Sequence, residues 1–182
     1  MTAVAIDVEH LVARWQEEVA RGPRSGRVDL LVRRLGTGDR DTPPRAELDV
    51  ERGLIGDRWE WMPNRPADGQ ISIMDRRVVD ALVPGDRSRW SVPGDNLIVD
   101  LDLSEAALPV GTRLRVGSAE LEVTAKVHAG CAKFRSRLGA DALAWVNGGD
   151  RGPLRLRGVF ARVVIAGAVA VGDVVETIRS LP

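Results

Sequence analysis

The chain has 182 residues, of which 44% are hydrophobic and 29% are charged, so its composition is that of an ordinary globular protein and excludes wholesale disorder. Its length suits one domain with a single hydrophobic core. Its 26 basic and 26 acidic residues balance, which excludes the overall positive field typical of proteins that bind nucleic acid or an anionic membrane.

An amphipathic helix is the first predicted element, over residues 7–21. Its apolar residues recur at helical spacing, and they are Val8, Leu11, Val12, Trp15 and Val19. Glu17 and Glu18 lie on the other side of this helix. The breaker sequence at residues 22–26 ends it. We therefore divide the chain into an N-terminal helix and linker, residues 1–26, and a folded domain, residues 27–182.

The N-terminal stretch also bears on the compartment of the protein. It contains acidic residues and no apolar core of the kind that a secretory signal needs. No stretch approaches the ~18 uninterrupted apolar residues of a transmembrane helix. Because the sequence holds one cysteine, no intrachain disulfide can form, and we expect a protein of the reducing cytoplasm.

Short strands separated by turns dominate the first half of the domain. Runs of alternating apolar residues predict strands over residues 27–35, 46–50, 71–74 and 96–101. The segment 36–44 is rich in Gly, Asp, Thr and Pro, which predicts a loop. Asp75 is a suitable N-cap for a short helix over residues 76–82.

A hairpin and two short helices fill the second half. Strands are predicted over residues 113–116, 119–126, 159–165 and 174–178, the first two joined by the turn Gly117-Ser118. Helices are predicted from the loop that holds Cys131 through Leu138, and over residues 140–146. Many short strands with regular turns and few helices predict a mainly β fold, a barrel or folded sheet with peripheral helices, in preference to a βαβ sandwich.

Cys131 is the strongest candidate for chemistry. It lies at a junction between strand and helix, and the helix amides ahead of it, together with Lys133 and Arg135, favour the thiolate over the thiol. A thiolate can ligate a soft metal or carry sulfur. The alternative is that Cys131 is a small buried hydrophobic residue.

His128 precedes Cys131 by three residues and is a weaker candidate. It is able in principle to help deprotonate the cysteine or to hydrogen-bond a ligand, although alternation along a strand need not turn both side chains the same way. One cysteine with the two histidines, His10 and His128, does not make a standard tetrahedral zinc site.

Two glycine-containing clusters and a set of arginines offer sites for an anion. Residues 53–58 and 93–97 let backbone amides approach a ligand, and Arg58 and Asn96 carry groups suited to phosphate or pterin edges. The alternative is that both clusters are tight turns at the rims of a barrel. Further candidates are three arginines near the end of the chain and three tryptophans able to stack a planar ring, namely Arg155, Arg157, Arg162, Trp59, Trp61 and Trp90.

Taken in order, these clusters resemble the MOSC domain, named for the C-terminal part of molybdenum-cofactor sulfurase. The resemblance runs from about residue 27 to residue 178 and follows an ordered series of segments. These are residues 53–58, 70–74, 93–99, 101–103, 108–114, 117–124, 131–134, 157–163, 167 and 171–173.

The resemblance implies a closed, mostly antiparallel barrel with peripheral helices, of the MOSC or pyruvate-kinase-barrel kind, with a pocket around the cysteine. In relatives that bind molybdenum cofactor the cysteine supplies a thiolate ligand, which here is Cys131. The resemblance implies a cofactor-binding role for Lys133, Arg58, Asn96, Arg157, Asp57 and Arg162. Characterised relatives reduce N-hydroxylated compounds with electrons from partner proteins, and others were proposed to handle sulfur.

Two departures accompany the resemblance. Many members carry a histidine after the turn that resembles Gly-Asp-Arg, where this chain has Trp59. We also expect neither the separate N-terminal barrel domain nor the pyridoxal-phosphate lyase domain of larger relatives in this chain, so that cofactor contacts would come from this domain or from another subunit.

The residues, together with what the resemblance implies, suggest three alternative functions. The first is a molybdenum-dependent oxidoreductase that acts on an N-hydroxylated small molecule with an electron-donor protein. The second is a non-catalytic carrier that holds persulfide sulfur, received from a cysteine desulfurase, or the cofactor itself on Cys131. The third is an interaction module with a buried, silent thiol.

Overall fold

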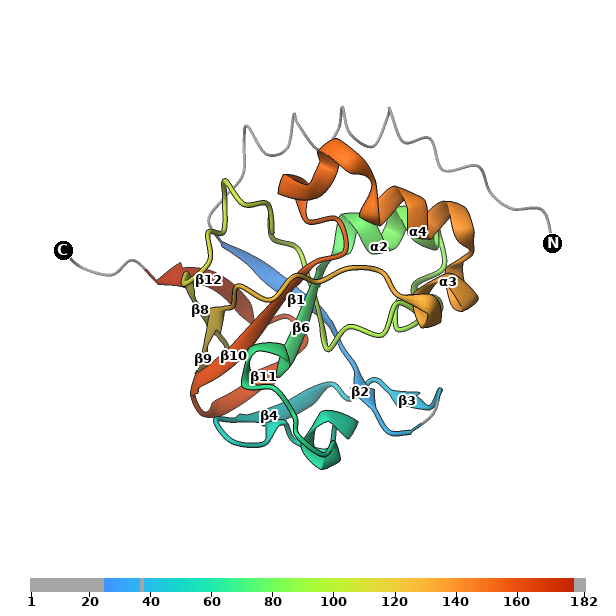
Figure 1. Ribbon diagram of the computed structural model, residues 1–182. Coiled ribbons are helices and arrows are strands. Elements are labelled where there is room, and N and C mark those ends of the chain that lie inside the picture. Colours follow the sequence, from blue (N-terminus) through green and yellow to red (C-terminus); the bar gives the residue numbers. More distant parts are fainter. Residues whose placement is uncertain (1–24, 37, 179–182) are drawn as a thin grey trace.

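A closed barrel of seven strands forms the centre of the computed structural model, which describes residues 25–36 and 38–178 (Figure 1). In barrel order the strands are β1 (Ser25–Leu31), β12 (Val174–Ile178), β8 (Arg113–Val116), β9 (Ala119–Val123), β10 (Val159–Ile165), β6 (Ile71–Asp75) and β7 (Leu97–Val99). All neighbouring pairs are antiparallel except β6 and β7. The predicted mainly β barrel is therefore confirmed. The helix predicted over residues 7–21 lies outside the described residues.

Period-two alternation explains how the strands close into a barrel. In the hairpin of β8 and β9, Leu114 pairs with Leu121 and both side chains are fully buried in the barrel. Their neighbours Arg113 and Glu122 face outward, where they form an ion pair. Aliphatic side chains from every strand of the barrel fill its interior in this way, so the barrel is a packed core.

Helices cover one side of the barrel and form a second core there (Figure 1). They are α2 (Arg76–Leu82), α3 (Ala132–Leu138) and α4 (Ala140–Asn147), and the 3-10 helix η4 (Gly149–Leu154) follows α4. Phe134 of α3 and Trp145 of α4 pack with Met74 and Ile98 from the outer face of the barrel. Strand β6 is buried along its whole length because it lies between this cluster and the barrel interior. As predicted, Asp75 caps α2 by accepting a hydrogen bond from the Arg77 backbone amide.

Two small sheets complete the fold, and they account for most differences from the predicted strands. One has the order β11 (Gly167–Ala170), β4 (Arg45–Asp49) and β5 (Gly53–Leu54), and the other pairs β2 (Arg33–Arg34) with β3 (Arg40–Asp41). The predicted loop 36–44 therefore contains a strand, and β11 was missed. The predicted strand 27–35 is divided because Val32 bonds to Asn96 and the backbone of Arg34 bonds to Asp57, outside the barrel.

The predicted strand 119–126 ends at Val123, with a consequence for the site. Thr124 still bonds to Phe160 of β10, but the chain from residue 125 to Gly130 leaves the barrel ladder and leads to α3. Further 3-10 turns lie between the barrel strands, namely η1 (Arg58–Trp61), η2 (Ala67–Gly69) and η3 (Arg87–Arg89). In the part of the chain that the structure describes, no helix has the length and apolar character needed to cross a membrane.

Gly158 holds the start of β10 against β6. Its φ is +94°, and a Cβ at this position would lie 2.0 Å from the carbonyl oxygen of Ile73. Only glycine allows both the left-handed backbone and this close approach. The tight contact places Arg157, the preceding residue, beneath α3.

Candidate functional site

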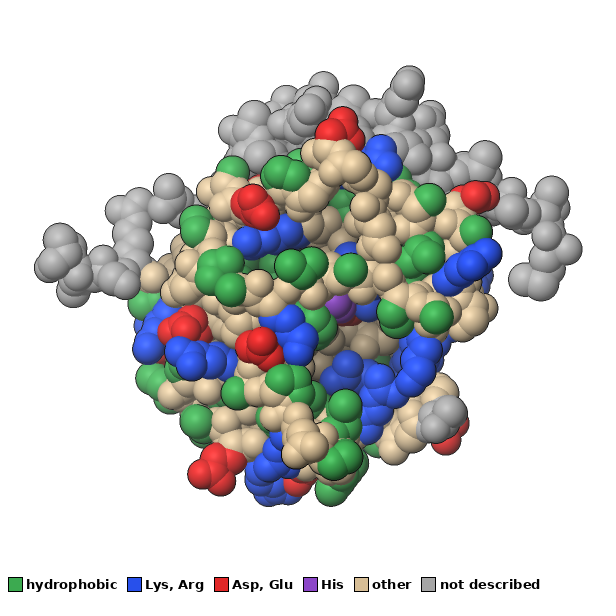
Figure 2. Space-filling model, viewed as in Figure 1, with side chains coloured by type: hydrophobic (Ala, Val, Ile, Leu, Met, Phe, Trp, Pro, Cys, Tyr) green, Lys and Arg blue, Asp and Glu red, His purple; other side chains and the backbone are tan. Residues whose placement is uncertain are grey.

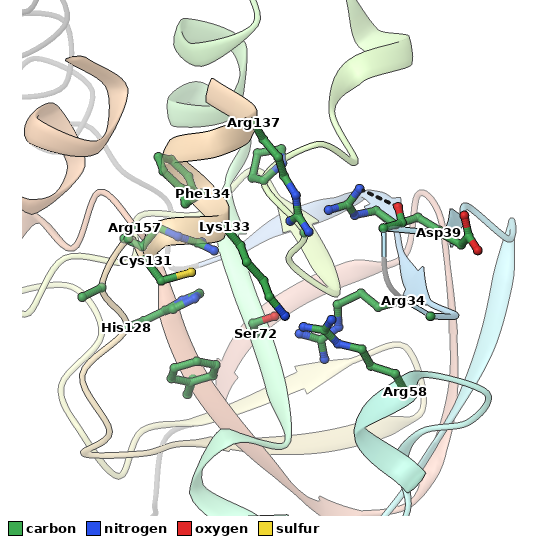
Figure 3. A pocket seen from close by; sticks show the side chains of 18 of the residues that line it. Arg34, Asp39, Arg58, Ser72, His128, Cys131, Lys133, Phe134, Arg137 and Arg157 are labelled. Carbon is green, nitrogen blue, oxygen red and sulfur yellow. Dashed lines mark hydrogen bonds between the residues drawn. The ribbon is translucent and has the colours of Figure 1, made fainter. Parts of the chain in front are cut away.

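A cationic cavity of about 400 Å³ lies between the end of the barrel, the β2–β3 hairpin and α3. Figure 2 shows the hollow, with lysine and arginine side chains along one wall and a histidine at its back. The side chains that carry charge or chemistry in its lining are Arg34, Asp39, Arg40, Arg58, His128, Cys131, Lys133, Arg137 and Arg157. In Figure 3 the labelled basic side chains and the Cys131 sulfur point toward the same space.

Cys131 is exposed in this cavity, at the N-cap of α3. Its partial burial alone would raise the pKa of the thiol. The backbone amides of Phe134 and Lys133, together with the charges of Arg157 and Arg137, outweigh that effect and lower the pKa below its ordinary value. The sulfur is therefore accessible and biased toward the thiolate, which removes the interpretation of Cys131 as a buried hydrophobic residue.

Four cations of the lining lack an acidic partner among the described residues. They are Arg40, Arg58, Lys133 and Arg137. Burial and the neighbouring guanidinium groups, chiefly that of Arg137, lower the pKa of Arg40. Burial and Arg34 do the same to the pKa of Arg58. Because these groups repel one another and Arg40 Nε is buried without a hydrogen-bond partner, the cavity is suited to an anion.

A buried carboxylate organises the floor of the cavity. Asp95 is fully buried and accepts a hydrogen bond of 2.6 Å from Arg157, whose guanidinium also stacks on the ring of Phe134. The other oxygen of Asp95 lies 3.5 Å from Nε2 of His128. Burial lowers the pKa of His128 to about 3, so its imidazole, packed on Phe160, is neutral at pH 7.

A second buried carboxylate, Asp57, fixes one wall. It accepts hydrogen bonds from the backbone amide and the guanidinium of Arg34, at 2.7 to 2.9 Å, and from the side-chain amide of Asn96 at 3.0 Å. Burial would raise the pKa of Asp57, but the hydrogen bonds and charge of Arg34 lower it. Asn96 also contacts Ser72 and the carbonyl of Val32, so this network ties the hairpin to the barrel.

The predicted site residues fall into three groups. Cys131, Lys133, Arg58 and Arg157 come together in the lining of the cavity.

Asp57 and Asn96 lie behind the lining. Both are fully buried, and their polar atoms form hydrogen bonds with Arg34, Ser72 and each other. They therefore hold the lining residues in place, which corrects the prediction that they contact a ligand directly. Arg162 lies on the outer face of β10, where it is exposed and pairs with Glu122 at 2.6 Å. Arg162 shares this face with Phe160 of the cavity lining, but it lies two residues farther along β10 and is held by Glu122 of the neighbouring strand, so its inclusion in the cofactor-binding set is corrected.

The sequence interpretation missed Arg34, Arg40 and Arg137. A signal for Arg137 exists, since it follows Lys133 by four residues on a predicted helix and must share its face. Arg34 and Arg40 had no such signal, because only the pairing of β2 with β3 brings them to the cavity. Trp59 and Trp90 are buried, Trp61 is exposed, and none of the three lines the cavity.

In the described part of the chain, no group of three or more His, Cys, Asp or Glu side chains is placed to hold a metal ion. Any metal at Cys131 would thus take fewer than three ligands of this kind from the described residues.

A family model agrees with this geometry. The model of the MOSC domain matches residues 66–176, which is more than half of the chain and includes Cys131. No curated protein matches the sequence.

Solved structures show the same fold. A structure described as that of a hypothetical protein is similar with a TM-score of 0.63 and 20% identity over 90% of this chain and 73% of its own. The YUAD protein from Bacillus subtilis has a TM-score of 0.57 and 19% identity, over 86% of this chain and 97% of its own. YiiM from Escherichia coli has a TM-score of 0.58 and 20% identity, over 85% of this chain and 71% of its own.

Proposed function

Because this chain belongs to the MOSC domain family, we propose that its cationic cavity binds a molybdenum-pterin cofactor through the Cys131 thiolate, and that the protein reduces N-hydroxylated compounds. The observation that carries the proposal is an exposed cysteine of lowered pKa in a cavity with unpaired cations. A soft metal prefers thiolate, and a phosphate ester prefers arginine. The two preferences meet in one cavity.

The residues present fit such a group. The volume of about 400 Å³ lies in the range of pockets for cofactors and small molecules. Cys131 would supply the thiolate, while Arg40, Arg58, Lys133 and Arg137 would neutralise the phosphate. The bound cofactor would supply two-electron redox chemistry.

The floor and wall residues have supporting roles in this proposal. Asp95 holds Arg157 in place below Cys131, and Asp57 holds Arg34, so two arginines of the lining have fixed positions before any ligand binds. Preorganised charges bind more strongly because no ordering cost remains. The neutral His128 adds no further charge to the cavity.

The proposed reaction also requires two partners. Reduction of an N–OH group to N–H consumes two electrons and two protons and releases water, so the protein needs an electron-donor protein as well as its small-molecule substrate.

Metal and pterin content tests the proposal. Protein purified from a host that makes the cofactor should contain molybdenum and pterin in equal amounts, and Cys131→Ala should lose the molybdenum because a thiolate ligand is removed. Inductively coupled plasma mass spectrometry and pterin fluorescence measure the two contents.

Arg162→Met is the matched control, since it removes an arginine outside the cavity and should leave both contents unchanged. Absence of molybdenum from the wild-type protein, or equal molybdenum in Cys131→Ala, would end the proposal.

A sulfur carrier is the second candidate, favoured by the exposure of the Cys131 sulfur. An accessible thiolate can accept a sulfur atom from the persulfide of a cysteine desulfurase. Intact-protein mass spectrometry after incubation with a desulfurase and cysteine should then show one added sulfur atom, reversible by a reductant and absent from Cys131→Ala.

A further inference from the structure

A second cavity, of about 450 Å³, lies on the other side of the segment 127–129. Its lining comes from the loop before β8, from this segment, from the end of α4 and from the start of β10. Charged, polar and valine side chains of the lining are those of Glu105, Val110, Thr124, Lys126, Val127, Val146, Asn147, Arg155 and Val159. Nothing in the proposed cofactor binding uses these side chains.

The two cavities share part of their lining. His128 and Arg157 belong to both, together with Val127 and Ala129. Two of these shared side chains have a buried nitrogen without a hydrogen-bond partner among the described residues, namely Nδ1 of His128 and Nε of Arg157. His128 is 7% exposed in its side chain, so burial of a free ring nitrogen there costs free energy unless a bound molecule or water satisfies it.

The second cavity differs from the first in its charge. Lys126 pairs with Asp68 at 3.2 Å, and Arg157 pairs with Asp95. Arg155 donates to the carbonyl of Leu108 at 2.7 Å and lies beside Glu105. Each cation therefore already has a partner.

Four valines supply much of the remaining wall, namely Val110, Val127, Val146 and Val159. A cavity with paired charges, four valines in its wall and a few free polar atoms favours an uncharged molecule with an apolar body and a small polar end.

We propose that the second cavity binds the uncharged N-hydroxylated substrate, with its polar end toward His128 and Arg157 at the boundary with the first cavity. This inference rests on the proposed function for the class of substrate. Charge assigns the two ligands to different cavities. The anionic cofactor requires the cations of the first cavity that lack acidic partners among the described residues, whereas an uncharged substrate does not.

Binding of benzamidoxime to the cofactor-free, full-length protein tests the inference. This probe is an uncharged aromatic amidine with an N–OH group. Titration followed by two-dimensional ¹H–¹⁵N NMR should shift the backbone amides of Val110, Thr124, Gly152 and Val159 in a saturable manner. The amides of Gly36 and Gly94, which line only the first cavity, should stay in place.

A variant that fills the cavity sharpens the test. Val110 is 52% exposed, so Val110→Trp should fold and should weaken binding by about tenfold, or about 1.4 kcal/mol. Val171→Trp is the matched control, an exposed valine in a turn outside the cavity, and should keep the wild-type affinity. Benzamidine, which is protonated at neutral pH, should bind less tightly than benzamidoxime.

Equal affinities in Val110→Trp and Val171→Trp would overturn the inference, as would shifts confined to the first cavity or the absence of saturable shifts. None of these measurements needs the cofactor. A protein without molybdenum would therefore refute the proposed function, but the benzamidoxime titration could still be interpreted. A failed titration would refute this inference and would not affect the molybdenum assay.

Discussion

The chemistry of Cys131 depends on neighbours that are distant in the sequence. Lys133 and Phe134 supply backbone amides from the same helix, but Arg157 comes from the start of β10. A carboxylate, Asp95, holds that arginine in place without any exposure to solvent. The site is therefore one exposed thiol surrounded by cations, of which Arg34 and Arg157 are held in place by ion pairs with buried carboxylates.

Removal of one of these cations should change the thiol. We expect Arg137→Met to raise the pKa of Cys131 toward its ordinary value and to slow alkylation at pH 7 severalfold, because a nearby positive charge that favours the thiolate is lost. The rate of reaction with iodoacetamide from pH 5 to pH 10 measures the change.

Arg135→Met provides a control on the same helix, because Arg135 does not line the cavity. Superimposable pH–rate profiles for the wild type and Arg137→Met would contradict the expected role of Arg137.

Helices α2 and α3 begin at different kinds of cap, and the difference matches their roles. Asp75 caps α2 and is buried between the helix layer and the barrel, 2% exposed. Cys131 caps α3 and leaves its side chain open to the cavity. The cap of α2 is bonded within the protein beside β6, whereas the cap of α3 leaves its sulfur exposed in the cavity. Reciprocal hydrogen bonds between Asn147 of α4 and the backbone of Gly130 hold this second junction in place.

The buried cap predicts a specific pH dependence of stability. Burial raises the pKa of Asp75 from 3.8 to about 6 against the opposing effect of Arg77. The folded protein therefore binds a proton here more tightly than the unfolded chain. The stabilisation of the folded state by this tighter proton binding is fully present below about pH 4 and is lost as pH rises through 6. The free energy of unfolding then falls by an amount on the order of 3 kcal/mol.

Asp75→Asn has no such titration, so the free energy of unfolding of this variant relative to wild type should rise between pH 4 and pH 7. Urea denaturation at several pH values measures it. Asp49→Asn is the control. Backbone hydrogen bonds from Arg52 and Glu51 lower the pKa of Asp49, so the free energy of unfolding of this variant relative to wild type should fall, not rise, with increasing pH. Parallel stability curves for Asp75→Asn and wild type would disprove the expected titration.

The whole molecule has no net formal charge, yet its charges are not evenly distributed. On the outside of the barrel arginines alternate with carboxylates, as in the pair of Arg115 with Glu176. In the cavity, by contrast, Arg40 and Arg58 lack acidic partners among the described residues. The local positive field is produced by the fold, which gathers cations from several segments and leaves their counterions elsewhere.

A polyanion should therefore stabilise the folded protein. Pyrophosphate at about ten times its Kd should add about 1.4 kcal/mol, since a ligand that binds only the folded state shifts the unfolding equilibrium. A thermal unfolding series should show a rise in Tm that the double variant Arg40→Met, Arg58→Met reduces strongly.

Arg115→Met removes a paired arginine and should keep the full rise in Tm. A rise of the same size in the double variant would place the anion outside the cavity.

Much of the fold could be predicted because it depends on local patterns. Alternation located the strands of the β8–β9 hairpin, and the Asp75 cap located α2. Strand ends were less accurate, because Val123 and Val32 mark places where hydrogen bonds to distant segments redirect the chain. Strand β11 was missed since its pairing with β4 joins residues far apart in the sequence.

Local patterns were enough to predict a mainly β fold, the resemblance to the family, and a cysteine at the start of a helix with a lysine two residues after it. Which charges face Cys131 depends on contacts between distant segments. These contacts place Asn96 and Asp57 behind the cavity wall, hold Arg162 outside the cavity and bring in Arg34 and Arg40 from a small hairpin. The reason is that local periodicity reports which face of an element is buried, whereas the meeting of charges depends on barrel closure between strands that are distant in the chain.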